Sequence, residues 1–171
     1  DVLMVRKEKE ELIPCGIPYI FGTLKKSAKD VVPDKVLSSA GVELKIDEVV
    51  SIDREKKIAK TANGTEISFE KLIFATGSTP VVPKWLKGTN LENVFLIRKD
   101  REYLDKVKIK LEECKKIAVI GGGFIGVEVS DELNKTGKDI TIIEILPHIL
   151  SLAFDEELVI EAEKIPKARG V

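Results

Sequence analysis

Residues 115–144 read KKIAVIGGGFIGVEVSDELNKTGKDITIIE, and this stretch decides the fold. The apolar run Lys116–Ile120 predicts a buried strand, and Phe124–Thr136 predicts a helix that ends before Gly137. A second apolar run, Asp139–Glu144, predicts another strand. Two strands joined by a single helix predict a βαβ unit, in which the strands run parallel.

Three glycines, Gly121, Gly123 and Gly126, join the first strand to the helix in the spacing G-x-G-x-x-G. Gly121 permits a tight turn, Gly123 lets the backbone approach a pyrophosphate, and Gly126 lets the helix pack closely on the strand. The helix N-terminus offers unpaired N–H groups and the positive end of its dipole to the phosphates. Glu144 ends the next strand, where its carboxylate can accept hydrogen bonds from ribose hydroxyls and would repel a 2′-phosphate. The pattern predicts an NADH site, with NADPH less favoured; a glycine-rich turn without a ligand is the alternative.

The rest of the chain also mixes helical and strand-like periodicity. The other predicted elements are strands at 2–5 and 71–75, both expected to be buried, helices at 32–40, 98–114 and 155–168, and an antiparallel β-meander over 42–52, 57–61 and 65–69. Asn63-Gly64 lies between the last two runs, and this dipeptide is a strong hairpin signal. The pattern as a whole therefore predicts an α/β chain with an inserted β-meander.

Composition excludes several classes of protein. The 171 residues are 43% hydrophobic and 33% charged, which suits a packed core rather than a disordered tail. The 28 basic and 29 acidic residues nearly balance, so no nucleic-acid partner is expected. No apolar run approaches the roughly 18–20 residues that span a bilayer, so no membrane association is expected. Only two cysteines are present, which favours a cytoplasmic location. Glutamine is absent while Lys and Glu abound, which is typical of thermophile proteins. We expect no metal site.

Cys15 lies in the segment Ile13–Tyr19, which reads IPCGIPY. A free cysteine is commonly a small buried apolar residue. A cysteine at the start of a short helix can instead be a redox thiol, because the helix dipole favours the thiolate. Position 20 is Ile20, so no nearby cysteine completes a disulfide, and a redox cycle would use a sulfenic acid or a mixed disulfide. Cys114 ends a charged helix and is interpreted as structural.

Three landmarks follow one another along the chain: CGIPY at 15–19, LIFATGSTP at 72–80, and GGGFIG with its terminal Glu144. This order resembles the pyridine nucleotide-disulfide oxidoreductases, and most of all their single-cysteine branch of NADH oxidases, NADH peroxidases and coenzyme A-disulfide reductases. The resemblance covers essentially the whole chain, and its CGIPY segment favours the redox role for Cys15. The fold class that it implies is α/β, with Rossmann-like units of a two-dinucleotide-binding flavoprotein, an inserted antiparallel β-meander and incomplete ends.

The resemblance implies FAD and NADH as cofactors and assigns residues to each. Cys15 would face the flavin as the catalytic thiol. The expected FAD contacts are Glu48, Val49, Ala75, Thr76, Gly77 and Arg98. The expected NADH site comprises Gly121, Gly122, Gly123, Phe124, Ile125, Gly126, Glu128 and Glu144. Hydride would pass from NADH to the flavin, and electrons would then pass to Cys15 or directly to oxygen.

The resemblance also divides the chain into domains. Residues 1–100 would be the remainder of an FAD-binding domain that lacks its first βα unit. Residues 101–171 would be the first half of an NADH-binding domain. The chain alone is then expected to be catalytically inactive, and the full-length protein to be a homodimer. The residue for the FAD ribose is left open among Arg6, Lys7 and Glu8, of which only Glu8 has suitable chemistry.

The electron acceptor is expected to be a small molecule, either oxygen, peroxide or a disulfide. Glu11 and Pro14 stand where relatives that reduce coenzyme A disulfide tend to carry polar residues, and the acid would disfavour an anionic substrate. One alternative is a reductase of a protein electron carrier of the ferredoxin or rubredoxin type. Another is a non-catalytic nucleotide-binding module.

Overall fold

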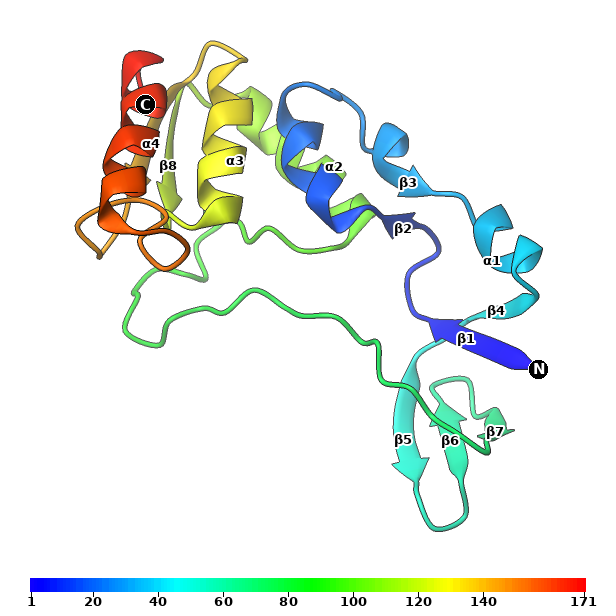
Figure 1. The fold of residues 1–171 in the computed structure, drawn as a ribbon. Coiled ribbons are helices and arrows are strands. Elements are labelled where there is room, and N and C mark those ends of the chain that lie inside the picture. Colours follow the sequence, from blue (N-terminus) through cyan, green and yellow to red (C-terminus); the bar gives the residue numbers. More distant parts are fainter. The chain divides into compact units, whose positions relative to one another are not determined.

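The computed structural model describes residues 1–171, and their contacts divide the chain into two compact units. Unit 1 comprises residues 1–11 and 31–100, and unit 2 comprises residues 12–30 and 101–171 (Figure 1). Residues 12–30, which the sequence assigns to the first domain, thus share their contacts with the second unit.

Unit 1 contains a two-stranded parallel sheet. Strand β1 (Val2–Arg6) pairs with β4 (Val42–Ile46), residue for residue from one end to the other. The chain between them forms the short strands β2 (Glu11–Leu12) and β3 (Val31–Val32) and the helix α1 (Lys35–Ser39). Helix α1 is shorter than the predicted 32–40. It is followed by Gly41 at φ +75°, the left-handed conformation that ends many helices.

The β-meander is confirmed, with one change in its extent. Strands β5 (Val49–Asp53), β6 (Ile58–Thr61) and β7 (Glu66–Ser68) pair antiparallel in that order. The turn between β6 and β7 contains Gly64 at φ +83°, as the Asn-Gly dipeptide predicts. The predicted run 42–52 splits at Asp47-Glu48, because β4 belongs to the parallel sheet and only β5 joins the meander.

Two expectations for unit 1 are wrong. Residues 2–5 do form a strand, but it is not buried, and Val2 is 62% exposed. Residues 71–75 form no strand at all, and Ile73 is 86% exposed. A strand needs a neighbouring ladder of N–H and C=O groups, and none pairs with 71–75. The two-stranded sheet around β1 likewise leaves much of that strand uncovered.

Unit 2 confirms the βαβ unit. Strand β8 (Lys116–Ile120) pairs in parallel with β9 (Asp139–Ile143), and helix α3 (Phe124–Asn134) connects them. The unit also contains α2 (Arg101–Glu112), α4 (Glu156–Ala168), and the 3₁₀ helices η1 (Pro14–Phe21) and η2 (Ser27–Asp30). Its buried apolar core consists of Leu12, Ile17, Ile20, Phe21, Leu104, Val107, Leu111, Val129, Leu133, Ile140, Ile149 and Val159.

Helix α3 also anchors η1, the helix that carries Cys15. Glu132 of α3 is only 2% exposed, and its carboxylate accepts the N–H of Thr23 at 2.6 Å and the hydroxyl of Thr23 at 3.1 Å. Lys135 pairs with the same carboxylate at 2.5 Å. A Cβ at Gly22 would overlap the main chain and the carboxylate of Glu132, so the exit of η1 packs directly on α3.

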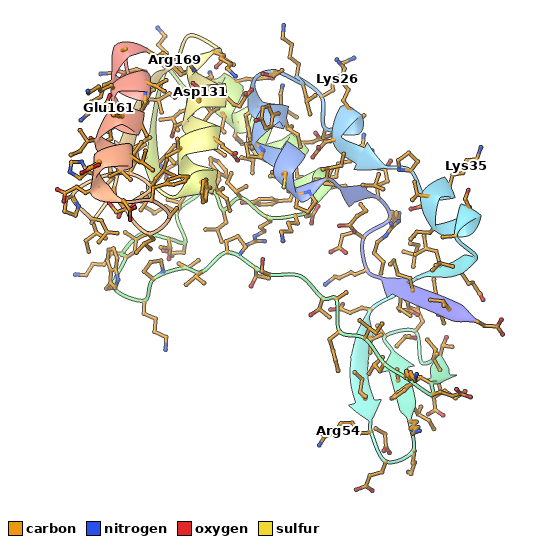
Figure 2. All side chains as sticks on the ribbon, viewed as in Figure 1. Lys26, Lys35, Arg54, Asp131, Glu161 and Arg169 are labelled. Carbon is orange, nitrogen blue, oxygen red and sulfur yellow. The ribbon has the colours of Figure 1, made fainter.

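Helix α4 is tied to α3 at its C-terminal end. Arg169 forms an ion pair with Asp131, and both residues are labelled in Figure 2. The carbonyl oxygen of Arg169 accepts the side-chain N–H of Asn134 at 2.9 Å. None of the helices is both long enough and apolar enough to cross a bilayer.

Candidate functional site

The glycine-rich turn between β8 and α3 has the backbone geometry that its sequence predicts. Gly121 has φ +104°, a conformation that strains other residues. A Cβ at Gly126 would overlap the carbonyl oxygen of Gly121, so only glycine allows this close approach of helix and turn. Gly123 has open space where its Cβ would lie, and its backbone is accessible. The turn therefore presents bare backbone at the point where a pyrophosphate would bind.

Helix α3 begins directly after Gly123 without a side-chain cap. The first N–H groups of an α-helix have no partner inside the helix, and no residue of this chain caps them with a side chain. Phe124 and Ile125 at this end are 55% and 60% exposed, and Glu128, one turn further on, is half-buried. An uncapped N-terminus beside a glycine turn suits a phosphate group.

Glu144 lies directly after β9 and contacts the glycine turn. Its Oε2 accepts the N–H of Gly122 at 2.5 Å, and its Oε1 accepts the N–H groups of Ile145 at 2.7 Å and Leu146 at 3.0 Å. The N–H groups of Leu146 and Gly122 are the main reason that the pKa of Glu144 lies below its ordinary value. A carboxylate offers about four acceptor positions, so one stays available for a ribose hydroxyl.

Cys15 is exposed and lies in the first turn of η1, after Pro14. The N–H of Gly16 donates to the carbonyl oxygen of Ile13 at 2.8 Å and closes this turn. Cys114 is half-buried, and its thiol donates to the carbonyl oxygen of Lys110 at 3.4 Å. The two cysteines therefore differ in accessibility, with Cys15 exposed and Cys114 half-buried and hydrogen-bonded to its own helix end.

The residues expected to contact FAD belong to unit 1, and all of them are exposed. Ala75, Thr76 and Gly77 lie in a segment without regular secondary structure, and Gly77 has φ +69° with open space at its Cβ position. Arg98 is also exposed. The exposed backbone of Gly77, which has no side chain, fits the close approach of a cofactor.

The backbone of Glu48 is already partly paired, which affects its expected role with adenine. Its N–H donates to Asp47 at 2.9 Å, and its carbonyl oxygen accepts the N–H of Ala62 at 2.8 Å. Its carboxylate pairs with Lys7 at 3.1 Å. Val49, the first residue of β5, pairs with Thr61 of β6, so both expected adenine contacts lie in backbone that the meander partly engages.

The contacts of Arg6 and Lys7 reduce the three candidates for binding the FAD ribose to one. Its guanidinium is buried and forms an ion pair with Asp34 at 2.9 Å, and it also donates to the carbonyl oxygens of Glu8 and Lys9. Arg6 therefore holds the chain after β1 in place. Lys7 is occupied by Glu48, which leaves the half-buried Glu8 as the candidate with acceptor chemistry.

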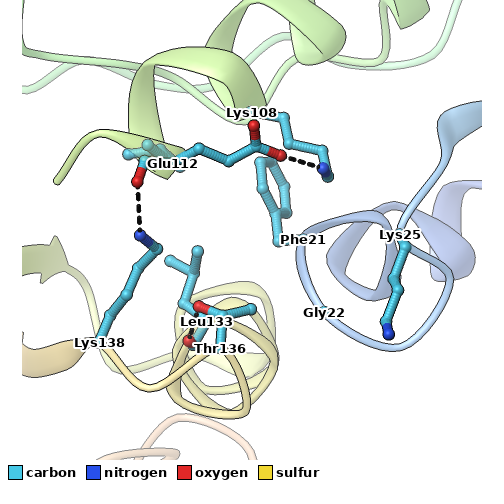
Figure 3. Close-up of a pocket in the computed structure, with 9 residues that line it drawn as sticks. Phe21, Gly22, Lys25, Lys108, Glu112, Leu133, Thr136 and Lys138 are labelled. Atoms are coloured by element: carbon cyan, nitrogen blue, oxygen red, sulfur yellow. Dashed lines mark hydrogen bonds and ion pairs between the residues drawn. The ribbon is translucent and has the colours of Figure 1, made fainter. Parts of the chain in front are cut away.

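A separate surface pocket of about 330 Å³ lies in unit 2, between the end of η1, α2 and α3 (Figure 3). None of the predicted site residues lines it. Its lining includes Lys25, Lys108 and Lys138, but Lys108 pairs with Glu112 at 2.5 Å and Lys138 donates to the carbonyl oxygen of Cys114 at 2.7 Å. Lys108 and Lys138 thus stabilise α2 and the residues directly after it.

Sequence reasoning missed the loop that follows Glu144. The N–H of Leu150 donates to the carbonyl oxygen of Gly122 at 2.7 Å, so this loop holds the second glycine of the turn. Leu150 has φ +60°, which is unusual for a residue other than glycine. No motif marks this contact, because it depends on where the loop folds back.

Comparison with known proteins now adds to this geometry. The family model described as pyridine nucleotide-disulphide oxidoreductase matches residues 1–171. An NADH oxidase of Methanocaldococcus jannaschii is 29% identical over 182 aligned residues, which cover 100% of this chain and 40% of that protein. An NAD(P)H coenzyme A polysulfide/persulfide reductase of Pyrococcus horikoshii is 34% identical, over 90% of this chain and 36% of that protein.

Solved structures agree with these sequence matches. The water-forming NADH oxidase from Lactobacillus brevis, solved with NADH bound, superposes with a TM-score of 0.87 at 26% identity. The superposition covers 100% of this chain and 40% of that one. The chain thus spans about 40% or less of the length of these relatives.

Proposed function

Because the chain belongs to the pyridine nucleotide-disulphide oxidoreductase family, we propose that it is part of an FAD-dependent NADH oxidoreductase. The observation that carries this proposal is the glycine turn 121–126 with Glu144 at its side. It combines a bare backbone at Gly123, an uncapped helix N-terminus and a carboxylate held by the turn itself. We assign the NADH site to these residues, with Phe124, Ile125 and Glu128 at its border.

Glu144 is the basis for proposing NADH rather than NADPH. Its lowered pKa keeps it ionised at neutral pH, and its position is fixed by three backbone N–H groups. A fixed negative charge at the ribose would repel the 2′-phosphate of NADPH. Ile145 follows directly and supplies no positive charge to offset that repulsion.

FAD is proposed as the second cofactor, contacted by Val49, by the exposed segment Ala75, Thr76 and Gly77, and by Arg98. When bound, the flavin would accept the hydride that NADH supplies and pass electrons on. Cys15 would act as the redox thiol beside it, because it is exposed in the first turn of η1. The anchoring of η1 on Glu132 would hold this thiol in place.

The remaining features of the enzyme are proposals for the whole protein. We propose a cytoplasmic homodimer whose acceptor is oxygen, peroxide or a disulfide. Two relatives support this choice of acceptor, since one is an NADH oxidase and the other is an NAD(P)H coenzyme A polysulfide/persulfide reductase. We expect residues 1–171 alone to be catalytically inactive, because they contain one G-x-G-x-x-G turn for two dinucleotides.

The test uses the product of the complete gene, purified without added flavin. We expect a flavin absorbance that NADH bleaches in the absence of oxygen. While the flavin is still oxidised and the thiol has been reduced, we also expect a long-wavelength charge-transfer band from the thiolate to the flavin. Cys15→Ser should remove this band, whereas the matched variant Cys114→Ser should keep it. Absence of flavin, or a flavin that NADH leaves oxidised, would reject the proposal.

The same variant separates the alternative acceptors. A reductase that passes electrons from flavin directly to a protein carrier should keep its carrier-reducing activity in Cys15→Ser. A disulfide reductase should lose its activity, because the thiol is part of the electron path.

A further inference from the structure

Glu144 and the loop 145–150, which follow β9, hold Gly122 from both sides. Leu150 donates its N–H to the carbonyl oxygen of Gly122 at 2.7 Å, while Gly122 donates its own N–H to Glu144 at 2.5 Å. Gly122 is buried, and a Cβ there would lie 2.9 Å from the side chain of Ile149. The peptide planes next to Gly123 are therefore fixed by residues that follow β9.

This loop is held in turn by one side chain of α4. Glu163 accepts the N–H of Ile149 through Oε1 at 3.0 Å, and the same oxygen lies 3.3 Å from Nδ1 of His148. Its other oxygen pairs with Lys167 at 2.7 Å. The side chain of Glu163 is only 14% exposed, so these groups replace most of its water.

The charge of Glu163 persists under all ordinary conditions. The hydrogen bond from Lys167 is the main cause that lowers the pKa of Glu163 to about 2, with further contributions from Ile149 and His148. Because it is ionised, the carboxylate accepts strong hydrogen bonds and does not compete for the loop's carbonyl groups as a donor.

A continuous chain of contacts thus runs from α4 to the glycine turn. It passes from Glu163 to Ile149, from the neighbouring Leu150 to Gly122, and from there to the open backbone of Gly123. Leu150 keeps its unusual φ of +60° within this chain of contacts. Such a conformation persists only where surrounding bonds determine it.

We propose that Glu163 is a positioning residue of the dinucleotide site, which fixes the loop 145–150 and through it the orientation of the Gly122 peptide that borders the pyrophosphate. The inference rests on the proposed NADH site, and it assigns to that site a residue that does not touch the ligand. Its effect would be on NADH affinity, through preorganisation of the turn.

Helix α4 offers a matched control. Glu161 lies two residues earlier, is exposed and pairs only with Lys164, at 2.5 Å (Figure 2). Removing Glu161 tests the loss of one negative charge and one exposed ion pair on the same helix. Glu163→Gln provides the conservative variant, because its amide oxygen can still accept the Ile149 N–H while the charge is lost.

The experiment measures two properties of the complete protein and its variants Glu163→Ala, Glu163→Gln and Glu161→Ala. The first is the dissociation constant of NADH, from quenching of protein fluorescence. The second is hydrogen–deuterium exchange of peptides that cover 145–151, measured without any nucleotide. We expect Glu163→Ala to weaken NADH binding about tenfold and to speed exchange in the loop. Both the NADH dissociation constant and the loop exchange rate of Glu163→Gln should lie between those of the wild type and Glu163→Ala. Those of Glu161→Ala should match the wild type.

The two readouts keep the failures apart. If the wild type does not bind NADH, the proposed function of this site is wrong, and the inference falls with it. If the wild type binds NADH but Glu163→Ala leaves loop exchange unchanged, only the inference is overturned. Faster exchange with unchanged NADH affinity would also overturn it. Circular dichroism checks that each variant is folded, and Glu163→Gln keeps the test valid if Glu163→Ala unfolds.

Discussion

At the scale of single residues, the glycines of the turn separate into two kinds. Gly126 is required by packing, because a Cβ would overlap the carbonyl oxygen of Gly121. Gly123 has no such constraint, since its φ of −75° suits any residue and its Cβ position is empty. Gly126 is thus needed for the packing of the fold, and we expect Gly123 to be needed for ligand binding.

Substituting these two glycines should therefore have different effects. We expect Gly126→Ala to lower the free energy of unfolding by about 1–3 kcal/mol and to abolish NADH binding, because the turn must shift. Gly123→Ala should leave thermal unfolding unchanged while weakening NADH binding at least tenfold, because the methyl group would occupy the approach to the pyrophosphate. Thermal unfolding and NADH titration check both. Equal loss of stability in both variants would contradict this division.

Asp30 is a buried acid with an oxygen that has no hydrogen-bond partner. It is 2% exposed, its Oδ2 has no hydrogen-bond partner, and it packs against Gly16, next to Cys15. Burial raises the pKa of Asp30 above its ordinary value. The unfolded chain therefore loses this proton at a lower pH than the folded chain, and Asp30 reduces stability as pH rises above about 4.

Replacing Asp30 with Asn should reveal this cost. We expect Asp30→Asn to be more stable than the wild type at pH 7, with a difference that shrinks as pH falls toward 4. The free energy of unfolding in urea, measured from pH 3 to pH 8, checks the pH dependence. A constant difference between the two proteins across this range would show that ionisation of Asp30 is not its cause.

The residues of the dinucleotide turn could be predicted from sequence because their signal is local. Gly121, Gly123, Gly126 and Glu144 are recognised by spacing between two apolar runs. The contacts of Glu163 and Glu132 could not be predicted, because each joins parts of the chain that no periodicity relates. Glu132 meets Thr23 across 109 residues. The sequence pattern marks Glu132 only as a charged helical residue.

At the scale of elements, strands were predicted well where the structure supplies a neighbour. β8 matches its predicted limits, and β9 ends one residue early, because each has the other as a partner. Residues 71–75 have equally strong strand character but no partner, and they form no strand. Propensity describes a residue's fit to a sheet and does not by itself create one.

The docking of η1 on α3 depends on Glu132. Its carboxylate accepts two hydrogen bonds from Thr23, and burial opposes its ionisation while Lys135 and Thr23 lower its pKa overall. We expect Glu132→Ala to reduce the free energy of unfolding by about 3 kcal/mol, since it leaves the Thr23 N–H unpaired. Urea unfolding measures this, with Glu161→Ala as the exposed control. A loss below about 0.5 kcal/mol would contradict the role.

The contribution of Glu163 to stability should decrease in acid. The folded-state pKa of Glu163 is about 2 and its ordinary value is 4.5, so its stabilising effect is complete above pH 4.5. The effect decreases as pH falls from 4.5 to about 2, because over this range the unfolded chain binds the proton and the folded chain does not. The difference in unfolding free energy between wild type and Glu163→Gln should follow this window. A difference that does not change from pH 6 to pH 2 would contradict it.

At the scale of the whole molecule, much apolar surface of this chain is open. In unit 1 the exposed side chains include Val2, Val50, Ile73, Phe74, Val81 and Trp85. Where such side chains adjoin, as Ile73 and Phe74 do in the sequence, they offer apolar surface for contacts. We expect residues 1–171 alone to bind the dye 8-anilinonaphthalene-1-sulfonate with enhanced fluorescence, more strongly than the complete protein does. Equal and weak dye binding by both would contradict this view.

The central claim is that the glycine turn 121–126 and Glu144 form an NADH site. Titration of the complete protein with NADH and with NADPH, followed by fluorescence, tests it most directly when repeated on Gly123→Ala and Glu144→Ala. The claim predicts tighter binding of NADH than of NADPH, a loss of both in Gly123→Ala, and a smaller difference between them in Glu144→Ala. Unchanged NADH affinity in Gly123→Ala would contradict it.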